Sequence, residues 1–244
     1  MTVIFQVVIP MHTDGLPDDN FLSVLTWLSP SFPVGGYVYS HSIEFAVEDS
    51  RITNEKELCV WIESILRFGA GRIDGALLCF TWRAIIESDY EQLRWAVNKG
   101  NVMRSSFEMG LESKAQGNAF IDTIVKSCPM ERLTMLLEEN PEYREAMSYS
   151  NAVGLVCAIA NISLRVTLLA YYHSVCSNLV SAGIRLIPLG QVAGQKCMKN
   201  LTSVIIKTVD AAISGDFNDL GTANPIIDWA SMKHETQYTR LFRS

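Results

Sequence analysis

The chain has 244 residues, of which 48% are hydrophobic and 19% are charged, and its formal net charge at pH 7 is −6. A single domain of this length buries roughly three-quarters of its unfolded surface, so one core suffices and a second domain is not required. Because lysine and arginine form no run or basic patch, we expect no nucleic-acid partner.

The N-terminal segment differs in pattern from the rest of the chain. Residues 1–17 predict an irregular arm, and residues 1–11 are apolar but lack the positive start and cleavage site of a signal peptide. The longest apolar stretch, residues 152–172, is interrupted by Asn161, Ser163 and Arg165, which argues against a membrane span. We expect a soluble, cytoplasmic protein without a membrane partner.

Helical periodicity begins at residue 18. Residues 18–20 predict a cap for a helix over 21–28, which two prolines then end, and a second helix is expected over 38–49. Asn54 with Glu57 three residues later is typical of a capping box. The apolar residues that follow share one helical face: Leu58, Trp61, Ile62, Ile65 and Leu66.

The remaining chain predicts helices almost without interruption. Helical patterns cover residues 73–85, 89–100 and 103–128, a short helix starts at 129, and two long buried helices lie within 146–187. Another covers 189–213, and Pro225 fits the first turn of a last helix that runs toward residue 241. No strand pattern competes. We predict an all-α fold, with residues 18–244 forming one compact domain of about nine or ten helices.

The sequence lacks the motifs of common nucleotide and metal sites. No Gly-Lys-Ser/Thr follows the glycines at 35–36, so a phosphate-binding loop is missing. The histidines, at positions 12, 41, 173 and 234, are scattered, and none pairs with another histidine or a cysteine at a ligand spacing. We expect no catalytic residue, no metal ligand, no cofactor and no GTP hydrolysis by the chain alone.

Six cysteines are present, at positions 59, 79, 128, 157, 176 and 197. None lies within four residues of another, which excludes zinc-knuckle spacing. Several have apolar neighbours, so we interpret all six as buried free thiols in a reducing compartment.

The loop after the first helix contains two prolines, which fix φ, and Gly35 and Gly36, which permit positive φ or close approach. The simpler interpretation is a rigid connection that packs on the core. The alternative is a loop that sets the start of a second helix, which carries Tyr37, His41 and Glu44 to a surface.

Arg104 and Glu108 are four residues apart on the helix predicted over 103–128, so they are expected to pair on a solvated face. The same helix continues with Glu112 and Lys114.

The C-terminal end combines residue types that anchor interfaces: Tyr238, Arg240, Leu241, Phe242 and Arg243. Because segments near a chain end usually fray, we expect residues 238–244 to be needed for partner binding but not for folding, so that deletion of residues 235–244 leaves the core intact. The alternative is that the two apolar residues among them fold back into the core.

Three segments in order resemble the UreF family of urease accessory proteins. They are residues 33–44, residues 182–191, which end in Leu-Gly-Gln191, and residues 234–244. One departure is His41-Ser42 before Ile43-Glu44, where the family often has Gln-Gly before Leu-Glu.

The resemblance implies an all-α scaffold that dimerises and binds the accessory protein UreD, called UreH in some species. Through that pair it implies contact with the GTPase UreG, whose nucleotide state it shapes, and docking on apo-urease during nickel insertion. The residues expected to bind partners are Gly35, Gly36, Tyr37, Glu44, Arg104, Glu108, Gln191, Tyr238, Arg240, Leu241, Phe242 and Arg243.

Two other functions compete with this adaptor. A helical enzyme would need Glu44, His41 and Arg104 to converge in a pocket. A nickel-binding chaperone in its own right would need several histidines or cysteines at ligand spacing, which the sequence does not show. The family resemblance favours the adaptor.

Overall fold

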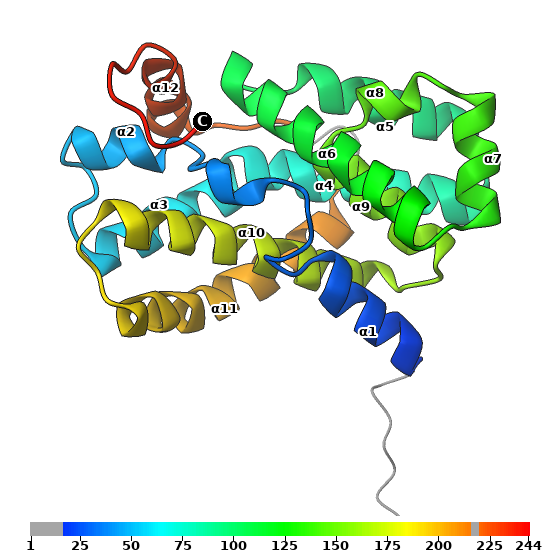
Figure 1. Ribbon diagram of the computed structural model, residues 1–244, viewed down its shortest axis with the longest axis horizontal. Helices are drawn as coiled ribbons and strands as arrows, with labels where there is room; N and C mark the ends of the chain where they lie inside the picture. The colour runs from blue at the N-terminus through cyan, green and yellow to red at the C-terminus, as the bar shows by residue number, and fades with distance from the viewer. Residues whose placement is uncertain (1–16, 216–219) are drawn as a thin grey trace, which may run out of the picture.

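The structure is a computed structural model that describes residues 17–215 and 220–244 (Figure 1). The described residues form twelve α-helices and one 3-10 turn, which confirms the predicted all-α class. The count exceeds the expected nine or ten because very short helices, such as α8, have too few residues to show a period. Except for Pro17, the expected arm lies outside the described residues.

The helices are α1 (Asp18–Trp27), α2 (Ile43–Glu48), α3 (Glu55–Phe68), α4 (Ala70–Glu87), α5 (Tyr90–Val102), α6 (Phe107–Ser127), α7 (Glu131–Glu139), α8 (Tyr143–Ala146), α9 (Tyr149–Ile159), α10 (Leu164–Leu186), α11 (Gln191–Ser214) and α12 (Pro225–His234), with the 3-10 turn η1 (Gly36–Val38) between α1 and α2.

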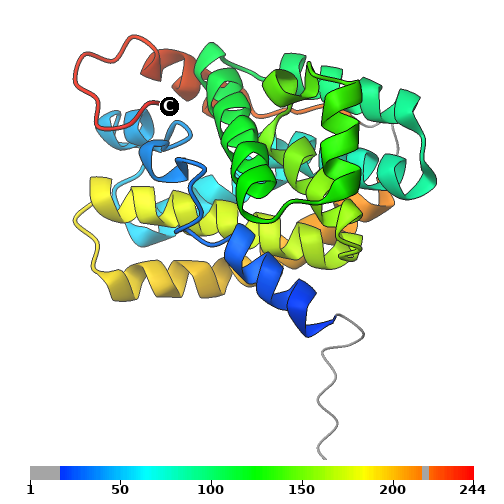
Figure 2. The same ribbon diagram turned by 45° about the vertical axis from the view of Figure 1, so that its right-hand side comes forward.

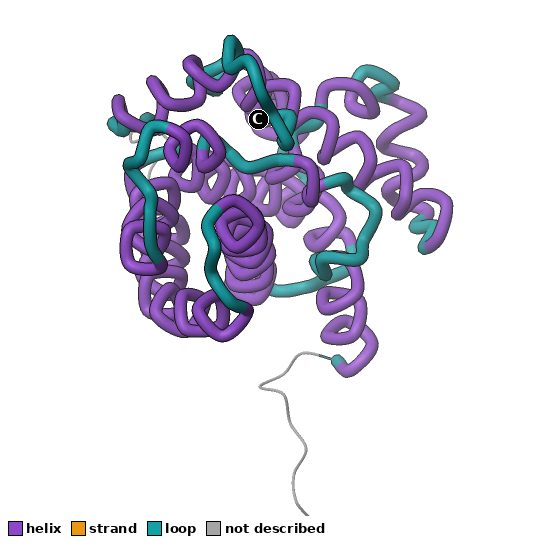
Figure 3. The backbone as a smooth tube through the Cα atoms, turned by 60° about the vertical axis from the view of Figure 1, so that its left-hand side comes forward, coloured by secondary structure: helices purple, strands orange, loops and turns teal. Residues whose placement is uncertain are grey.

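Helix α9 lies at the centre of the core. Residues 149–158 of this helix are all buried, and the helix packs against α4 and α6. Gly154 allows a close approach of α9 to α4, because a Cβ there would lie 2.8 Å from the backbone oxygen of Leu78. Helices α10 and α11 run side by side along one edge of the molecule (Figures 1 and 2). The core is therefore built from helices on every side of α9, and no strand occurs in residues 17–215 or 220–244 (Figure 3).

The predicted start of α3 is confirmed. The Asn54 side-chain oxygen accepts the Glu57 backbone N–H at 3.1 Å, and Glu57 in turn accepts the backbone N–H of Thr53 at 2.7 Å. The five apolar residues predicted to share one face are all buried. Local capping and periodicity thus specify this helix.

Two predicted helices are shorter than expected. The helix predicted over 38–49 is reduced to α2, because His41 and Ser42 adopt φ of 53° and 71°, which interrupts a right-handed helix. The last helix ends at His234 and does not run toward residue 241, although Pro225 occupies its first turn as predicted. The residues after His234 fold as a loop that lies beside α2 and near the start of α6 (Figure 1).

The prediction of six free thiols is wrong for one pair. Cys59 of α3 and Cys197 of α11 form a disulfide, with their Cα atoms 5.8 Å apart. Spacing along the chain could not reveal it, because 138 residues separate them and only helix packing brings them together. The other four cysteines are free.

Among the described helices, none combines the length and the apolar character that crossing a membrane requires.

Candidate functional site: a carboxylate cluster that holds the C-terminal segment

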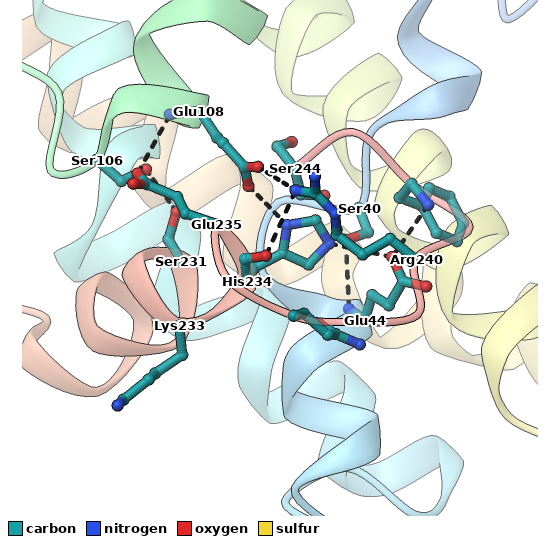
Figure 4. Close-up of polar contacts among 12 residues, drawn as sticks. Ser40, Glu44, Ser106, Glu108, Ser231, Lys233, His234, Glu235, Arg240 and Ser244 are labelled. Carbon is teal, nitrogen blue, oxygen red and sulfur yellow. Dashed lines mark hydrogen bonds and ion pairs between the residues drawn. The ribbon is translucent and has the colours of Figure 1, made fainter.

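Residues 235–244, here called the C-terminal segment, are held by carboxylates from α2 and α6 (Figure 4). Glu44 of α2 is almost fully buried and accepts the backbone N–H groups of Leu241 at 2.7 Å and Phe242 at 3.0 Å. A buried carboxylate needs several donors to offset its lost hydration. The backbone of the C-terminal segment supplies two of them.

His234 supplies the third donor to Glu44. Its ring is fully buried, with Nε2 3.0 Å from Glu44 Oε2 and Nδ1 2.6 Å from Glu108 Oε2 (Figure 4). Each ring nitrogen therefore faces a carboxylate oxygen, one from α2 and one from α6. The end of α12 is thereby joined to both α2 and α6.

Glu108, in the first turn of α6, has a second cationic partner. Arg240 Nη1 donates to Glu108 Oε1 at 2.5 Å. Beside it, Glu235 Oε1 accepts the backbone N–H of Phe107 at 2.9 Å, at the N-terminus of α6, where a negative charge is stabilising. The beginning of α6 and the C-terminal segment are therefore linked by reciprocal contacts.

The last residues pair with the chain before α2. The backbone N–H and the hydroxyl of Ser40 both donate to the Ser244 carbonyl oxygen, and the Arg243 N–H donates to the Val38 carbonyl oxygen at 2.8 Å. The Ser244 hydroxyl donates to Glu112 Oε2 at 2.6 Å. These bonds fix the segment along its length.

Aromatic side chains enclose Arg185, at the end of α10. Its guanidinium carbon lies 3.6 Å from the ring centroid of Tyr37 and 4.4 Å from that of Phe242. Arg185 also donates to the Tyr37 carbonyl oxygen at 2.8 Å. The cation thus connects η1 to the C-terminal segment by stacking and hydrogen bonding.

The expectation that residues 238–244 are not needed for folding stays a prediction, but part of this segment is buried in the chain's own core. Phe242 and Ser244 are 4% and 1% exposed, so Phe242 folds back as the alternative interpretation held. Leu241 does not, because it is 76% exposed, and Tyr238 is fully exposed. The sequence of this segment shows no periodic pattern of apolar residues. The contacts that hold it are polar, and they come from helices far away in the sequence.

Two large apolar residues of α6 are exposed as well. Phe107 and Leu111 are 71% and 51% exposed, and they lie four residues apart on one helical face. Phe107 donates its backbone N–H to Glu235, so this face adjoins the C-terminal segment. We call the four exposed side chains, Phe107, Leu111, Tyr238 and Leu241, the apolar rim.

The expected pairing of Arg104 with Glu108 is wrong. Arg104 precedes α6 and its Nη1 lies 2.9 Å from Asp74 Oδ1 of α4, with the Arg104 side chain only 6% exposed. Glu108 instead binds His234 and Arg240. Contacts with other elements therefore replace the expected surface pair on one helix.

Next to this ion pair, His41 faces Glu112, with Nδ1 3.5 Å from Oε2. Burial alone would lower the pKa of His41, but the hydrogen bond and charge of Glu112, with the charge of Asp74, raise that pKa above its ordinary value. Burial would likewise raise the pKa of Glu112, yet the contact with His41, the Ser244 hydroxyl and the charge of Arg104 lower it. Both groups are therefore held in their charged forms.

The remaining candidate residues lie at or near η1 and at the start of α11. Gly35 has φ of 74°, which a glycine adopts without strain, and a Cβ on Gly36 would lie 2.9 Å from the Asn178 side chain. Tyr37 is 64% exposed beside Arg185. Gln191 is the exposed first residue of α11, and no contact described for residues 17–215 and 220–244 joins it to the C-terminal segment.

Sequence reasoning missed the central member of the cluster, His234. Glu44 and Glu108 were both candidates, but they lie 190 and 126 residues from this histidine. The available signal was a lone histidine within the last predicted helix, which is too weak to identify its partners.

Comparison with known proteins agrees with the resemblance read from the sequence. The model of the family described as UreF matches residues 52–202. A urease accessory protein UreF from Granulibacter bethesdensis is 39% identical over 232 residues, covering 95% of this chain and 97% of the relative. Proteins of the same name from Rhodopseudomonas palustris (strain BisB5) and Bradyrhizobium diazoefficiens are each 40% identical over 221 residues, covering 91% of this chain and 90% of each relative.

Proposed function

Because this chain belongs to the UreF family of urease accessory proteins, we propose that it acts as an adaptor during nickel insertion into apo-urease. An accessory protein of this family serves urease maturation and is not itself an enzyme. In the proposed role it binds a UreD/UreH-type protein, and through that pair it engages the GTPase UreG and modulates its GTPase cycle. We place this assembly in the cytoplasm.

One observation carries the proposal: the apolar rim is exposed on a backbone that buried groups hold in place. Leu241 is 76% exposed, while its own N–H is bonded to Glu44. Tyr238 is fully exposed in the loop between His234 and Arg240, both of which bind Glu108. Because the backbone that carries these side chains is already ordered, binding costs less conformational entropy, which favours their use as interface anchors.

Leu241→Glu tests the adaptor role. We expect it to abolish co-purification of the UreD/UreH-type protein and to leave the melting temperature unchanged, because this side chain has few contacts in its own chain. Met135→Glu is the matched control, since Met135 is 53% exposed on α7, at the far end of the molecule from α12 (Figure 1). Full recovery of the partner with Leu241→Glu, or equal loss with both variants, would contradict the proposed surface.

We also propose that the chain forms a homodimer. The support is its family and its exposed apolar side chains, which include Phe21, Leu22 and Leu25 on α1. Light scattering across a wide concentration range measures the mass directly, and a monomer mass throughout would refute the dimer.

The nickel-binding chaperone has no geometric support among residues 17–215 and 220–244. There, no three histidine, cysteine, aspartate or glutamate side chains form a group that could hold a metal ion. Equilibrium dialysis of the isolated chain against Ni²⁺ distinguishes this alternative from the adaptor.

A further inference from the structure

A small cavity lies beside the carboxylate cluster, with both apolar and charged side chains in its wall. Its volume is about 60 Å³. Its walls come from η1, the loop before α2 and helices α3, α4, α6, α9 and α10, together with Arg104 of the connection between α5 and α6. The charged residues in its wall are His41, Asp74, Arg104 and Glu112. Neither Arg104 nor Asp74 takes part in the contacts described above that hold the C-terminal segment.

Arg104 has one donor without a partner. Its Nη1 binds Asp74 and its Nε donates to the Gly100 carbonyl oxygen at 3.3 Å. Its Nη2 is buried and has no hydrogen-bond partner. An unpaired donor on a buried guanidinium is costly, because the hydration it has lost is not replaced.

His41 presents a second donor to the same cavity. Its Nδ1 faces Glu112, which favours the charged ring, so Nε2 also carries a proton. This Nε2 is buried and without a partner. Arg104 is close enough that its charge lowers the pKa of His41, which places the two cations in one electrostatic environment.

The carboxylates in the wall already have partners. Asp74 binds Arg104 and accepts the Ser150 hydroxyl at 3.0 Å. Glu112 accepts from Gln116 and Ser244 and faces His41. The cavity therefore contains two positively charged side chains that each have a donor without an acceptor.

We propose that the cavity binds a small carboxylate, whose oxygens accept hydrogen bonds from Arg104 Nη2 and His41 Nε2. A water molecule requires about 10–15 Å³ of such volume, so the cavity holds about four to six non-hydrogen atoms. That size fits formate or acetate. Charge-assisted hydrogen bonds of this kind are the strong ones in proteins.

The test is a titration of the full chain with sodium formate, with sodium chloride at equal ionic strength as the reference. Nitrogen-15 NMR of the histidine rings reports the site. We expect a saturable shift of the His41 ring signals with formate alone, and no shift for His173, which is exposed. Equal responses to formate and chloride, or no response of His41, would overturn the proposal.

Two variants localise the binding. His41→Asn removes the charged donor, and asparagine tolerates the left-handed φ of 53° at this position. Arg104→Lys keeps a cation beside Asp74 but removes the free Nη2. Formate that binds the folded chain should raise its melting temperature. We expect each variant to need at least a tenfold higher formate concentration for the same rise, whereas His173→Asn needs the same concentration as the natural chain. Unaltered formate dependence in both variants would refute the site, and if neither variant folds, the titration of the natural chain decides.

Discussion

Replacing His234 by alanine tests whether the carboxylate cluster stabilises the fold. His234 is fully buried between Glu44 and Glu108, whose side chains are 6% and 12% exposed. Without the ring, two nearly buried carboxylates face the space that it occupied. Glu44 retains two backbone N–H donors and Glu108 retains Arg240, so neither is left entirely unpaired.

The size of the effect follows from these contacts. Removing one partner of a buried ion pair typically costs 3–5 kcal/mol, and the retained donors place His234→Ala near the lower end, at about 3 kcal/mol. For a chain of this size each kcal/mol lowers the melting temperature by roughly 2–4 °C, so the expected decrease is roughly 6–12 °C.

Thermal and urea unfolding of His234→Ala, with exposed His173→Ala as the control, measure this decrease. Adding Glu108→Gln should recover part of the loss, because it removes one of the two facing charges, and the coupling should be at least about 1 kcal/mol. A decrease of less than about 2 °C in His234→Ala, or strict additivity with Glu108→Gln, would show that the bridge contributes little.

Phe242→Ala should lower the free energy of unfolding by about 3 kcal/mol, as for other buried aromatic residues, and an unchanged urea midpoint would mean that the C-terminal segment is not part of the core. Gly75→Ala should lower the free energy of unfolding by about 1–3 kcal/mol, because the new Cβ would lie 2.0 Å from a buried tyrosine hydroxyl. Gly221→Ala is the control in the same urea melts and should have little effect, because a Cβ there would meet nothing within 4 Å. His41→Asn should lower the free energy of unfolding most in the pH range between two pKa values of the unfolded chain, about 4.5 for Glu112 and 6.5 for His41. It should shrink as pH rises through the raised pKa of His41 and as pH falls through the lowered pKa of Glu112, and a loss that grows above pH 8 would contradict the assigned contact.

Features specified within a few residues were predictable from the sequence. The capping box at Asn54, the buried face of α3 and Pro225 in the first turn of α12 all follow from caps and periodicity that act over one or two helical turns. The family resemblance likewise needed only short motifs in order, and the comparisons confirm it.

Contacts between distant parts of the chain were decided by tertiary structure alone. Glu44 and His234 are 190 residues apart, and nothing near either residue identifies the other. The same holds for the burial of Phe242, whose backbone is fixed by Glu44 and whose ring stacks on Arg185. The sequence therefore determined the helices, whereas packing determined which polar groups meet, because buried charges take whichever partners the assembled helices place beside them.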